Sequence, residues 1–237
     1  MALKLIISAG GKNIRMRDFL DRYFNGIPKH LLPLPNKKTI IEEIIDNAKN
    51  FFDEIVISVN HETYPIFRKK LGDLEKITIE IDTHLTGPLG PICRELLKTK
   101  KRIYGCAGDF FCNFSWKEFE DFHNSHKKPI SILVAPSLSI ADGACFTLKD
   151  KIITSWKRVE ETADFDIINI GAYIIDPHPL VVKKVSKIKY HKEDIFFNVF
   201  IPTKSVCGYN PNIIGFNINT PETYKKLCAW FRNQNHA

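Results

Sequence analysis

Apolar and polar positions in the first 140 residues follow two periodicities in turn. Short apolar runs, typical of strands buried on both faces, alternate with segments whose apolar residues recur every three or four positions, as on one face of a helix. The clearest helical segment, residues 39–52, places four isoleucines, one alanine and two phenylalanines along one face. The pattern predicts strands at 3–8, 54–60, 77–82, 102–109 and 130–135, and helices at 39–52, 62–72, 91–100 and 115–126.

Strands that alternate with helices indicate βαβ units and a mostly parallel sheet covered on both faces, which is an α/β fold. After about residue 140 the pattern becomes mixed. It predicts a hairpin at 145–156 and three further strands at 166–176, 206–210 and 214–218. A last helix is predicted from 220 onward, with Thr220 as N-cap and Pro221 in its first turn. No linker or repeat divides the chain, so we expect residues 1–237 to form a single domain whose halves meet near residue 140.

The bulk composition narrows the class of protein. No apolar run reaches the length of a membrane span, and no signal peptide opens the chain, so we expect a cytoplasmic protein without membrane insertion. The six cysteines form no C-x-x-C pair, which predicts reduced, buried thiols. The net charge of +7 favours anionic ligands in general, but the basic residues are scattered, so we expect no nucleic-acid partner.

The stretch "SAGGKNIRM", residues 8–16, follows the first predicted strand. Gly10 and Gly11 remove side chains where the backbone leaves the strand, so that consecutive N–H groups can surround an anion such as a phosphate. Arg15 can reach the same anion with a planar fork of donors. A tight turn followed by a solvated arginine is the alternative interpretation of this stretch alone.

Further motifs continue along most of the chain in a fixed order: "AGGKNIRM", "PKHLLPL", "GPLGPICREL", "CAGDFFCN", "NIGAYIID", "EDIFFNVF" and "GFNINTPETY". Together they resemble the signature of the sugar-phosphate nucleotidyltransferases, also called NDP-sugar pyrophosphorylases. The resemblance implies a Rossmann-like, three-layer nucleotide-diphospho-sugar transferase fold. Its nucleotide-binding half would span about 1–140 and its sugar-binding half about 141–237. Short members of the family include the heptose 1-phosphate guanylyltransferases and the N-acetylmuramate 1-phosphate uridylyltransferases, and the stretches "VISVNHETYPIFRKKLGD" and "EDIFFNVF" resemble the heptose type more.

The resemblance implies a Mg²⁺-dependent enzyme of nucleotide-sugar biosynthesis, and polysaccharide biosynthesis is the pathway class it suggests. An NTP and a sugar 1-phosphate would be the substrates, an NDP-sugar and pyrophosphate the products. The catalytic residues would be Arg15 on the leaving phosphates, Lys29 between the α-phosphate and the sugar phosphate, and Asp109 as a Mg²⁺ ligand. A homodimer is compatible with the family.

The remaining site residues also follow from the resemblance. The nucleotide-binding set would be Ala9, Gly10, Gly11, Asn13 and Gly87. The sugar-binding set would be Gly108, Asn169, Gly171, Glu193 and Lys157, with Arg158 as the neighbouring cation. Asn217 would be the second metal ligand, with Asn219 two residues further along as the substitute. Helix capping is the alternative role for Asp109, and an exposed position at a helix start is the alternative for Glu193.

The chain departs from the family pattern at three positions. Asn13 stands for a glycine, and we expect the turn to survive because asparagine tolerates left-handed backbone. Ile14 replaces a threonine and supplies no hydroxyl. Asn217 replaces a metal-binding aspartate and offers oxygen without charge. Two alternative functions therefore stay open: cytidylyl transfer to a phosphoalcohol such as phosphocholine, and a catalytically silent protein that binds a nucleotide sugar.

Overall fold

The computed structural model describes residues 2–84, 86–136, 141–161 and 167–234. Its strands are β1 Lys4–Ser8, β2 Glu54–Val59, β3 Ile77–Ile81, β4 Ile103–Ala107, β5 Phe110–Phe111, β6 Ile130–Pro136, β7 Ala141–Lys149, β8 Ile152–Glu161, β9 Ile167–Ile175, β10 Val206–Tyr209 and β11 Phe216–Asn217. Its α-helices are α1 Arg17–Phe24, α2 Ile40–Ala48, α3 Tyr64–Leu71, α4 Gly90–Thr99, α5 Trp116–Asn124, α6 Pro179–Val185, α7 Glu193–Phe200 and α8 Pro221–Gln234. Three short 3₁₀ turns complete the described elements: η1 Ile14–Met16, η2 Lys29–Leu31 and η3 Ile201–Thr203.

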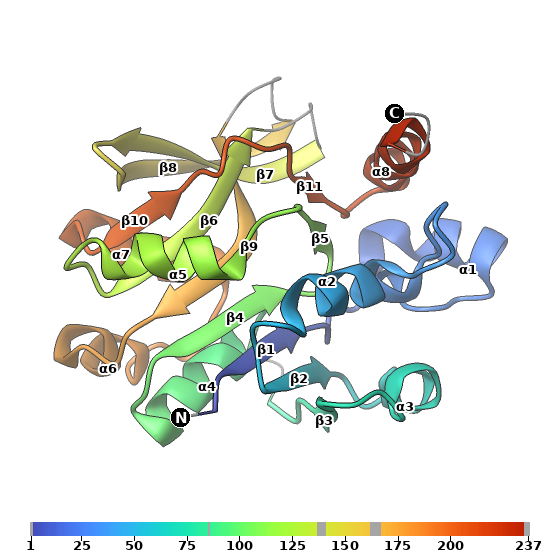
Figure 1. Ribbon diagram of the computed structural model, residues 1–237, viewed down its shortest axis with the longest axis horizontal. Helices are drawn as coiled ribbons and strands as arrows, with labels where there is room; N and C mark the ends of the chain where they lie inside the picture. The colour runs from blue at the N-terminus through green and yellow to red at the C-terminus, as the bar shows by residue number, and fades with distance from the viewer. Residues whose placement is uncertain (1, 85, 137–140, 162–166, 235–237) are drawn as a thin grey trace.

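Strands from both halves of the chain form one nine-stranded sheet, in the order β3-β2-β1-β4-β9-β6-β10-β8-β7 (Figure 1). The strands β3, β2, β1 and β4 are parallel to one another, and so are β6 and β10. The strand β9 runs antiparallel to both β4 and β6, and β8 runs antiparallel to β7 and β10. A separate antiparallel pair, β5 with β11, lies beyond the end of β4.

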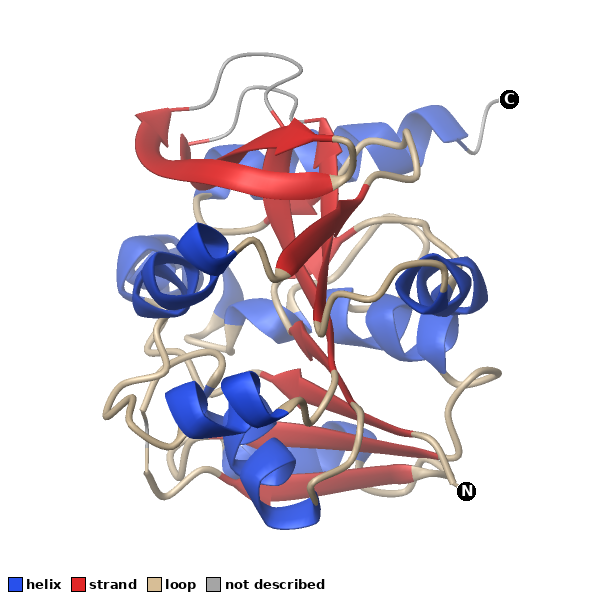
Figure 2. Cartoon of the chain, turned by 90° about the vertical axis from the view of Figure 1, so that its left-hand side faces the viewer, coloured by secondary structure: helices blue, strands red, loops and turns tan. Residues whose placement is uncertain are grey.

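Helices lie on both sides of the sheet (Figure 2) because its strands alternate buried side chains between two faces. In β1, Leu5 and Ile7 belong to one hydrophobic cluster and Ile6 to the other. The first cluster contains buried residues of α1, α2, α3, α5 and α8, and the second contains those of α4, α6 and α7. A strand with apolar side chains on both faces requires this double cover. The α/β fold predicted from the sequence is therefore confirmed.

Most predicted elements agree with the structure. Ser115 caps α5 by accepting a hydrogen bond from the backbone N–H of Glu118, and Thr220 precedes α8 as predicted. The predicted hairpin is β7 with β8, although both strands extend further than expected. Residue 166, the first of the predicted strand 166–176, lies outside the described residues.

Three elements were missed for physical reasons. The helix α1 is amphipathic but mainly polar, with Leu20 as its buried residue, so few apolar positions mark it in the sequence. The helix α6 has seven residues, too few to establish a helical period. The strand β5 has two residues and exists only through its pairing with β11. Such an element is determined by a tertiary contact and carries no periodic signal.

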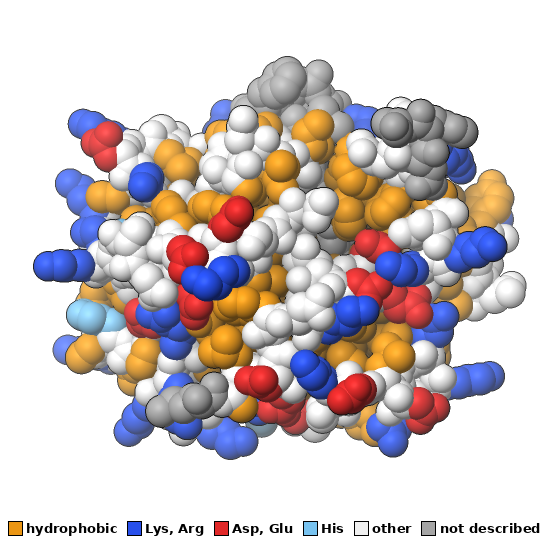
Figure 3. Space-filling model, viewed as in Figure 1, with side chains coloured by type: hydrophobic (Ala, Val, Ile, Leu, Met, Phe, Trp, Pro, Cys, Tyr) orange, Lys and Arg blue, Asp and Glu red, His pale blue; other side chains and the backbone are white. Residues whose placement is uncertain are grey.

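The distribution of basic residues on the surface and the state of the cysteines agree with the expectations from composition. Lys and Arg side chains are distributed over the face seen in Figure 3 with Asp and Glu between them, rather than in one continuous basic patch. All six cysteines are buried and free. Across the described ranges of the chain, no helix combines the length and apolar character that a membrane crossing requires.

Candidate active site

Two adjoining cavities open at the carboxyl ends of the parallel strands β1 to β4. The first has a volume of about 390 Å³ and is lined by residues between Ser8 and Asp109. The second has a volume of about 330 Å³ and adds residues from β8, β9, α7 and β11. Both are lined by Lys12, Asn13, Lys29, Pro88, Ala107 and Asp109. This edge is where open α/β sheets bind their ligands.

Three of the described residues that line the first cavity are glycines, which leave bare backbone at its wall. Gly10 and Gly11 both line it, and a Cβ at Gly11 would meet nothing within 4 Å. Gly87 also lines it and has a φ of +117°, where a Cβ would lie 2.8 Å from the carbonyl oxygen of His191. Only glycine adopts this conformation without strain. The loop before α4 therefore lies tightly against the segment before α7.

Asn13 has the left-handed backbone conformation, with φ 53° and ψ 27°, so the turn after β1 survives the loss of the family's glycine as predicted. The Oδ1 atom of Asn13 is buried and has no hydrogen-bond partner. Arg15 follows in η1 and lines the second cavity, as does Ile14, whose side chain is 72% exposed. An apolar side chain thus occupies the place where the family has a hydroxyl.

A chain of polar contacts joins the two cavities at Lys29. This residue begins η2, directly after Pro28, and is buried except for 8% of its surface. Its Nζ lies 2.5 Å from Oδ2 of Asp109 and donates to Oδ1 of Asn219 at 3.0 Å. The Nδ2 of Asn219 donates in turn to Oδ1 of Asn217 at 3.0 Å. Four predicted polar residues are therefore brought together at the boundary of the two cavities.

The electrostatics of this boundary favour ionised Asp109. Burial raises the pKa of its carboxyl, but the charge of Lys29, the contribution of His30 and the hydrogen bonds to the carboxylate together outweigh that effect, and the net pKa lies below the usual value. The neighbouring imidazole of His30 is held neutral because burial lowers its pKa to about 4, against the opposing attraction of Asp109. Asp109 precedes the strand β5, not a helix, so the helix-capping alternative is wrong.

The oxygen donors at this boundary suit Mg²⁺. Asp109 and Asn217 both line the second cavity and are held side by side, because β5 pairs with β11 and the N–H of Ile218 donates to the carbonyl oxygen of Asp109. Carboxylate and amide oxygens are the ligands a hard cation prefers, and Mg²⁺ completes its shell with waters and substrate phosphates. No group of three or more His, Cys, Asp or Glu residues able to hold a metal exists among the described residues.

The second cavity has a hydrogen-bonded wall around Glu193, the first residue of α7. Its Oε1 accepts from the Tyr173 hydroxyl at 2.6 Å and from Nδ2 of Asn169 at 2.7 Å. Burial raises the pKa of Glu193, partly offset by the Tyr173 hydrogen bond. Arg158, from β8, lines the same cavity, lies 3.9 Å from Oε2 of Glu193 and pairs with Asp194. The Glu193 side chain is 22% exposed, so it is not the freely exposed helix-start residue of the alternative interpretation.

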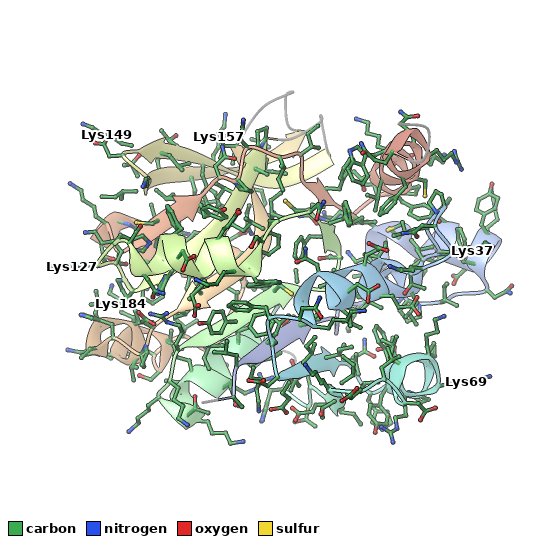
Figure 4. The ribbon with its side chains drawn as sticks, in the orientation of Figure 1. Lys37, Lys69, Lys127, Lys149, Lys157 and Lys184 are labelled. Atoms are coloured by element: carbon green, nitrogen blue, oxygen red, sulfur yellow. The ribbon has the colours of Figure 1, made fainter. Side chains whose placement is uncertain are left out.

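Several predicted residues do not reach either cavity. Lys157 is exposed on β8 (Figure 4), whereas the next residue, Arg158, lines the second cavity. Ala9 and Asn169 are buried and line neither cavity. Gly108 also lines neither: a Cβ there would lie 3.1 Å from both Ala9 and His30, so this glycine permits close packing beneath the site.

Tyr173 contacts the hydrogen-bonded wall around Glu193, and the motif analysis assigned it no role. It is 1% exposed, and its hydroxyl donates a hydrogen bond to Oε1 of Glu193. Its position was visible in the sequence, because Asn169, Gly171 and Tyr173 are two residues apart and therefore share one face of a strand. Gly171, at the centre of this spacing, lines the second cavity with a φ of +84°.

Comparisons with known proteins show what this chain is similar to. No family model matches the chain. Solved nucleotidyltransferases are similar in structure. HddC from Yersinia pseudotuberculosis in complex with GMP-PN has a TM-score of 0.73 and 18% identity, with 98% of this chain and 100% of that chain covered. CTP:phosphocholine cytidylyltransferase from Streptococcus pneumoniae (LicC) has a TM-score of 0.69 and 19% identity, with the same coverage. At these identities the likeness establishes the shared α/β fold.

Curated proteins are also similar in sequence. Mannose-1-phosphate guanyltransferase of Saccharomyces cerevisiae is 24% identical over 249 aligned residues, which cover 98% of this chain and 65% of the yeast protein. Mannose-1-phosphate guanylyltransferase 1 of Arabidopsis thaliana is 26% identical over 192 residues, 75% of this chain and 51% of that protein. The chain therefore spans less than two thirds of the length of these relatives. The resemblance to the sugar-phosphate nucleotidyltransferases that the sequence motifs indicated is confirmed.

Proposed function

We propose that this protein is a nucleotidyltransferase that transfers NMP from an NTP to a sugar 1-phosphate and releases pyrophosphate. One observation carries the proposal: two cavities share a wall, and Lys29 and Asp109 lie in that shared wall. A reaction between two anionic substrates needs both of them to meet at a cation. The similarity to mannose-1-phosphate guanyltransferases supports the same reaction class.

The first cavity would take the nucleotide, because its glycine-lined wall lets backbone approach a ribose and phosphates closely. The second would take the acceptor. Lys29 would offset the repulsion between the α-phosphate and the incoming phosphate, and Arg15 would hold the leaving phosphates. Asp109 and Asn217 would hold Mg²⁺ together with phosphate oxygens, and the ion would neutralise charge on the triphosphate.

The lining of the second cavity favours a sugar over phosphocholine. A quaternary ammonium is usually recognised by aromatic faces. The described residues that line this cavity include no aromatic side chain, whereas Glu193, Asn217 and Asn219 offer oxygens and amides for hydroxyl groups. The retained contacts of Lys29 with Asp109 argue against a silent binding protein.

A pyrophosphate-release assay tests this proposal. The purified protein is incubated with each common NTP, Mg²⁺ and a panel of sugar 1-phosphates, with phosphocholine as the competing acceptor. We expect pyrophosphate only when an NTP and a sugar 1-phosphate are both present, and we expect EDTA to abolish its release. Release with CTP and phosphocholine alone would select the phosphoalcohol reaction. An NDP-sugar that raises the melting temperature without any turnover would select the silent protein.

A further inference from the structure

We infer that Tyr173 and Asn169 are positioning residues, which hold the Glu193 carboxylate as a fixed hydrogen-bond acceptor for the hydroxyl groups of the sugar. This inference rests on the proposed function. It also changes the role of Asn169, which the family resemblance places in direct contact with the sugar. In the structure, Asn169 is 5% exposed, lines neither cavity and donates from Nδ2 to Glu193, which lines the second cavity.

The protons of this cluster have one consistent arrangement. The amide of Asn169 donates from Nδ2 to the Tyr173 oxygen at 2.9 Å and to Oε1 of Glu193 at 2.7 Å. The Tyr173 hydroxyl donates its own proton to Oε1 of Glu193 at 2.6 Å. Two of these three bonds therefore end on the carboxylate and the third orients the tyrosine that donates to it, an arrangement that favours the ionised form of Glu193.

The orientation of the Asn169 amide is itself fixed. Its Oδ1 accepts from the backbone N–H of Gly171 at 2.9 Å, so the amide cannot flip without losing this bond and both bonds from Nδ2. The left-handed φ of +84° at Gly171 belongs to this turn, and a Cβ there would lie 3.0 Å from that of Ala107. The strand β9 therefore provides a rigid base for the carboxylate.

The two oxygens of Glu193 consequently differ. Oε1 is held by two buried donors, whereas Oε2 is on the side of Arg158, at the cavity wall. A carboxylate fixed in this way presents an acceptor to the cavity and no donor. It selects acceptor substrates that carry hydroxyl donors, and preorganisation reduces the entropy lost when they bind.

The variant Tyr173→Phe tests the inference, with Tyr104→Phe as the matched control. Tyr104 is 2% exposed and donates its hydroxyl proton to another carboxylate, that of Glu120, on the opposite end of β4 from the site. We expect Tyr173→Phe to raise KM for the sugar 1-phosphate about tenfold, as loss of a hydrogen bond to a charged group does, with KM for the NTP unchanged. The Tyr173 hydrogen bond lowers the pKa of Glu193, so its loss should raise that pKa. We therefore expect the acidic limb of the pH profile of kcat/KM for the sugar 1-phosphate to move to higher pH. Tyr104→Phe should change neither.

A second readout needs no turnover. The titration of the Glu193 carboxyl is followed by NMR in protein labelled with ¹³C at glutamate Cδ, its signal assigned by its absence in Glu193→Gln. The pKa of Glu193 should rise in Tyr173→Phe and stay in place in Tyr104→Phe. If the wild type is active and Tyr173→Phe behaves like Tyr104→Phe in both readouts, the inference is overturned. An inactive wild type whose Glu193 still responds to Tyr173→Phe refutes the proposed function but retains the positioning role.

Discussion

The two adjoining cavities are built in different ways. The first is lined by the loops that follow β1 to β4, and Gly10, Gly11 and Gly87 contribute bare backbone to its wall. The second depends on side chains that come from β8, β9, α7 and β11 and hold one another through hydrogen bonds and ion pairs. Backbone groups suit a ligand common to many enzymes, whereas side chains can be exchanged to suit different acceptors.

This difference gives each wall its own sensitivity to mutation. The part of the first cavity formed by Gly10, Gly11 and Gly87, here called the backbone wall, depends on conformations that only certain residues adopt. Substitutions there change stability and loop position. The part of the second cavity formed by Arg158 and Glu193, with Asn169 and Tyr173 bonded to Glu193, is here called the side-chain wall. It depends on charge and hydrogen bonding, so its substitutions change the affinity for the acceptor. Lys29, which contacts both cavities, should affect the chemical step itself.

The largest effect is expected at Lys29. The variant Lys29→Ala should lower kcat by about 10²–10³, because it removes the cation between the two phosphates. The measurement is the rate of pyrophosphate release at saturating substrates. Lys69→Ala, an exposed lysine on α3 (Figure 4), is the control, and thermal unfolding checks that both variants fold. Unchanged turnover in Lys29→Ala would show that the cation shared by the two cavities has no part in the mechanism.

A smaller effect, on stability, is expected in the backbone wall. Gly87→Ala should lower the free energy of unfolding by about 1–3 kcal/mol, because an L-residue is strained at this φ and its Cβ collides with His191. Gly11→Ala should change stability by less than about 0.5 kcal/mol, since a Cβ there meets nothing within 4 Å. Urea denaturation compares the two variants. Equal loss in both would contradict the close approach of the two loops.

The smallest effect is expected in the side-chain wall. Arg158→Ala should raise KM for the sugar 1-phosphate about tenfold and leave KM for the NTP in place, because a charge-assisted contact to the acceptor is lost. Lys157→Ala should leave both constants unchanged, since Lys157 lines neither cavity. Initial-rate kinetics with each substrate varied separates the two outcomes. A rise in KM for the NTP in Arg158→Ala would move this arginine to the nucleotide side.

The sequence by itself determined the backbone wall. Gly10 and Gly11 directly follow an apolar run, and this order predicts a loop at the carboxyl end of a buried strand whatever the rest of the fold does. The left-handed turn at Asn13 is likewise favoured locally, because asparagine tolerates this backbone conformation better than most residues. Local patterns report local structure, so this part of the site was predictable.

Only the tertiary structure decided the side-chain wall. Lys157 and Arg158 are adjacent in the sequence, and neighbouring residues of a strand face opposite sides, so the strand's orientation in the sheet selects the arginine. Tyr173 and Glu193 meet because β9 and α7 pack together, and Asp109 and Asn217 meet because two-residue strands pair across the chain. Contacts between distant segments depend on register and packing, which the apolar pattern of each segment does not specify.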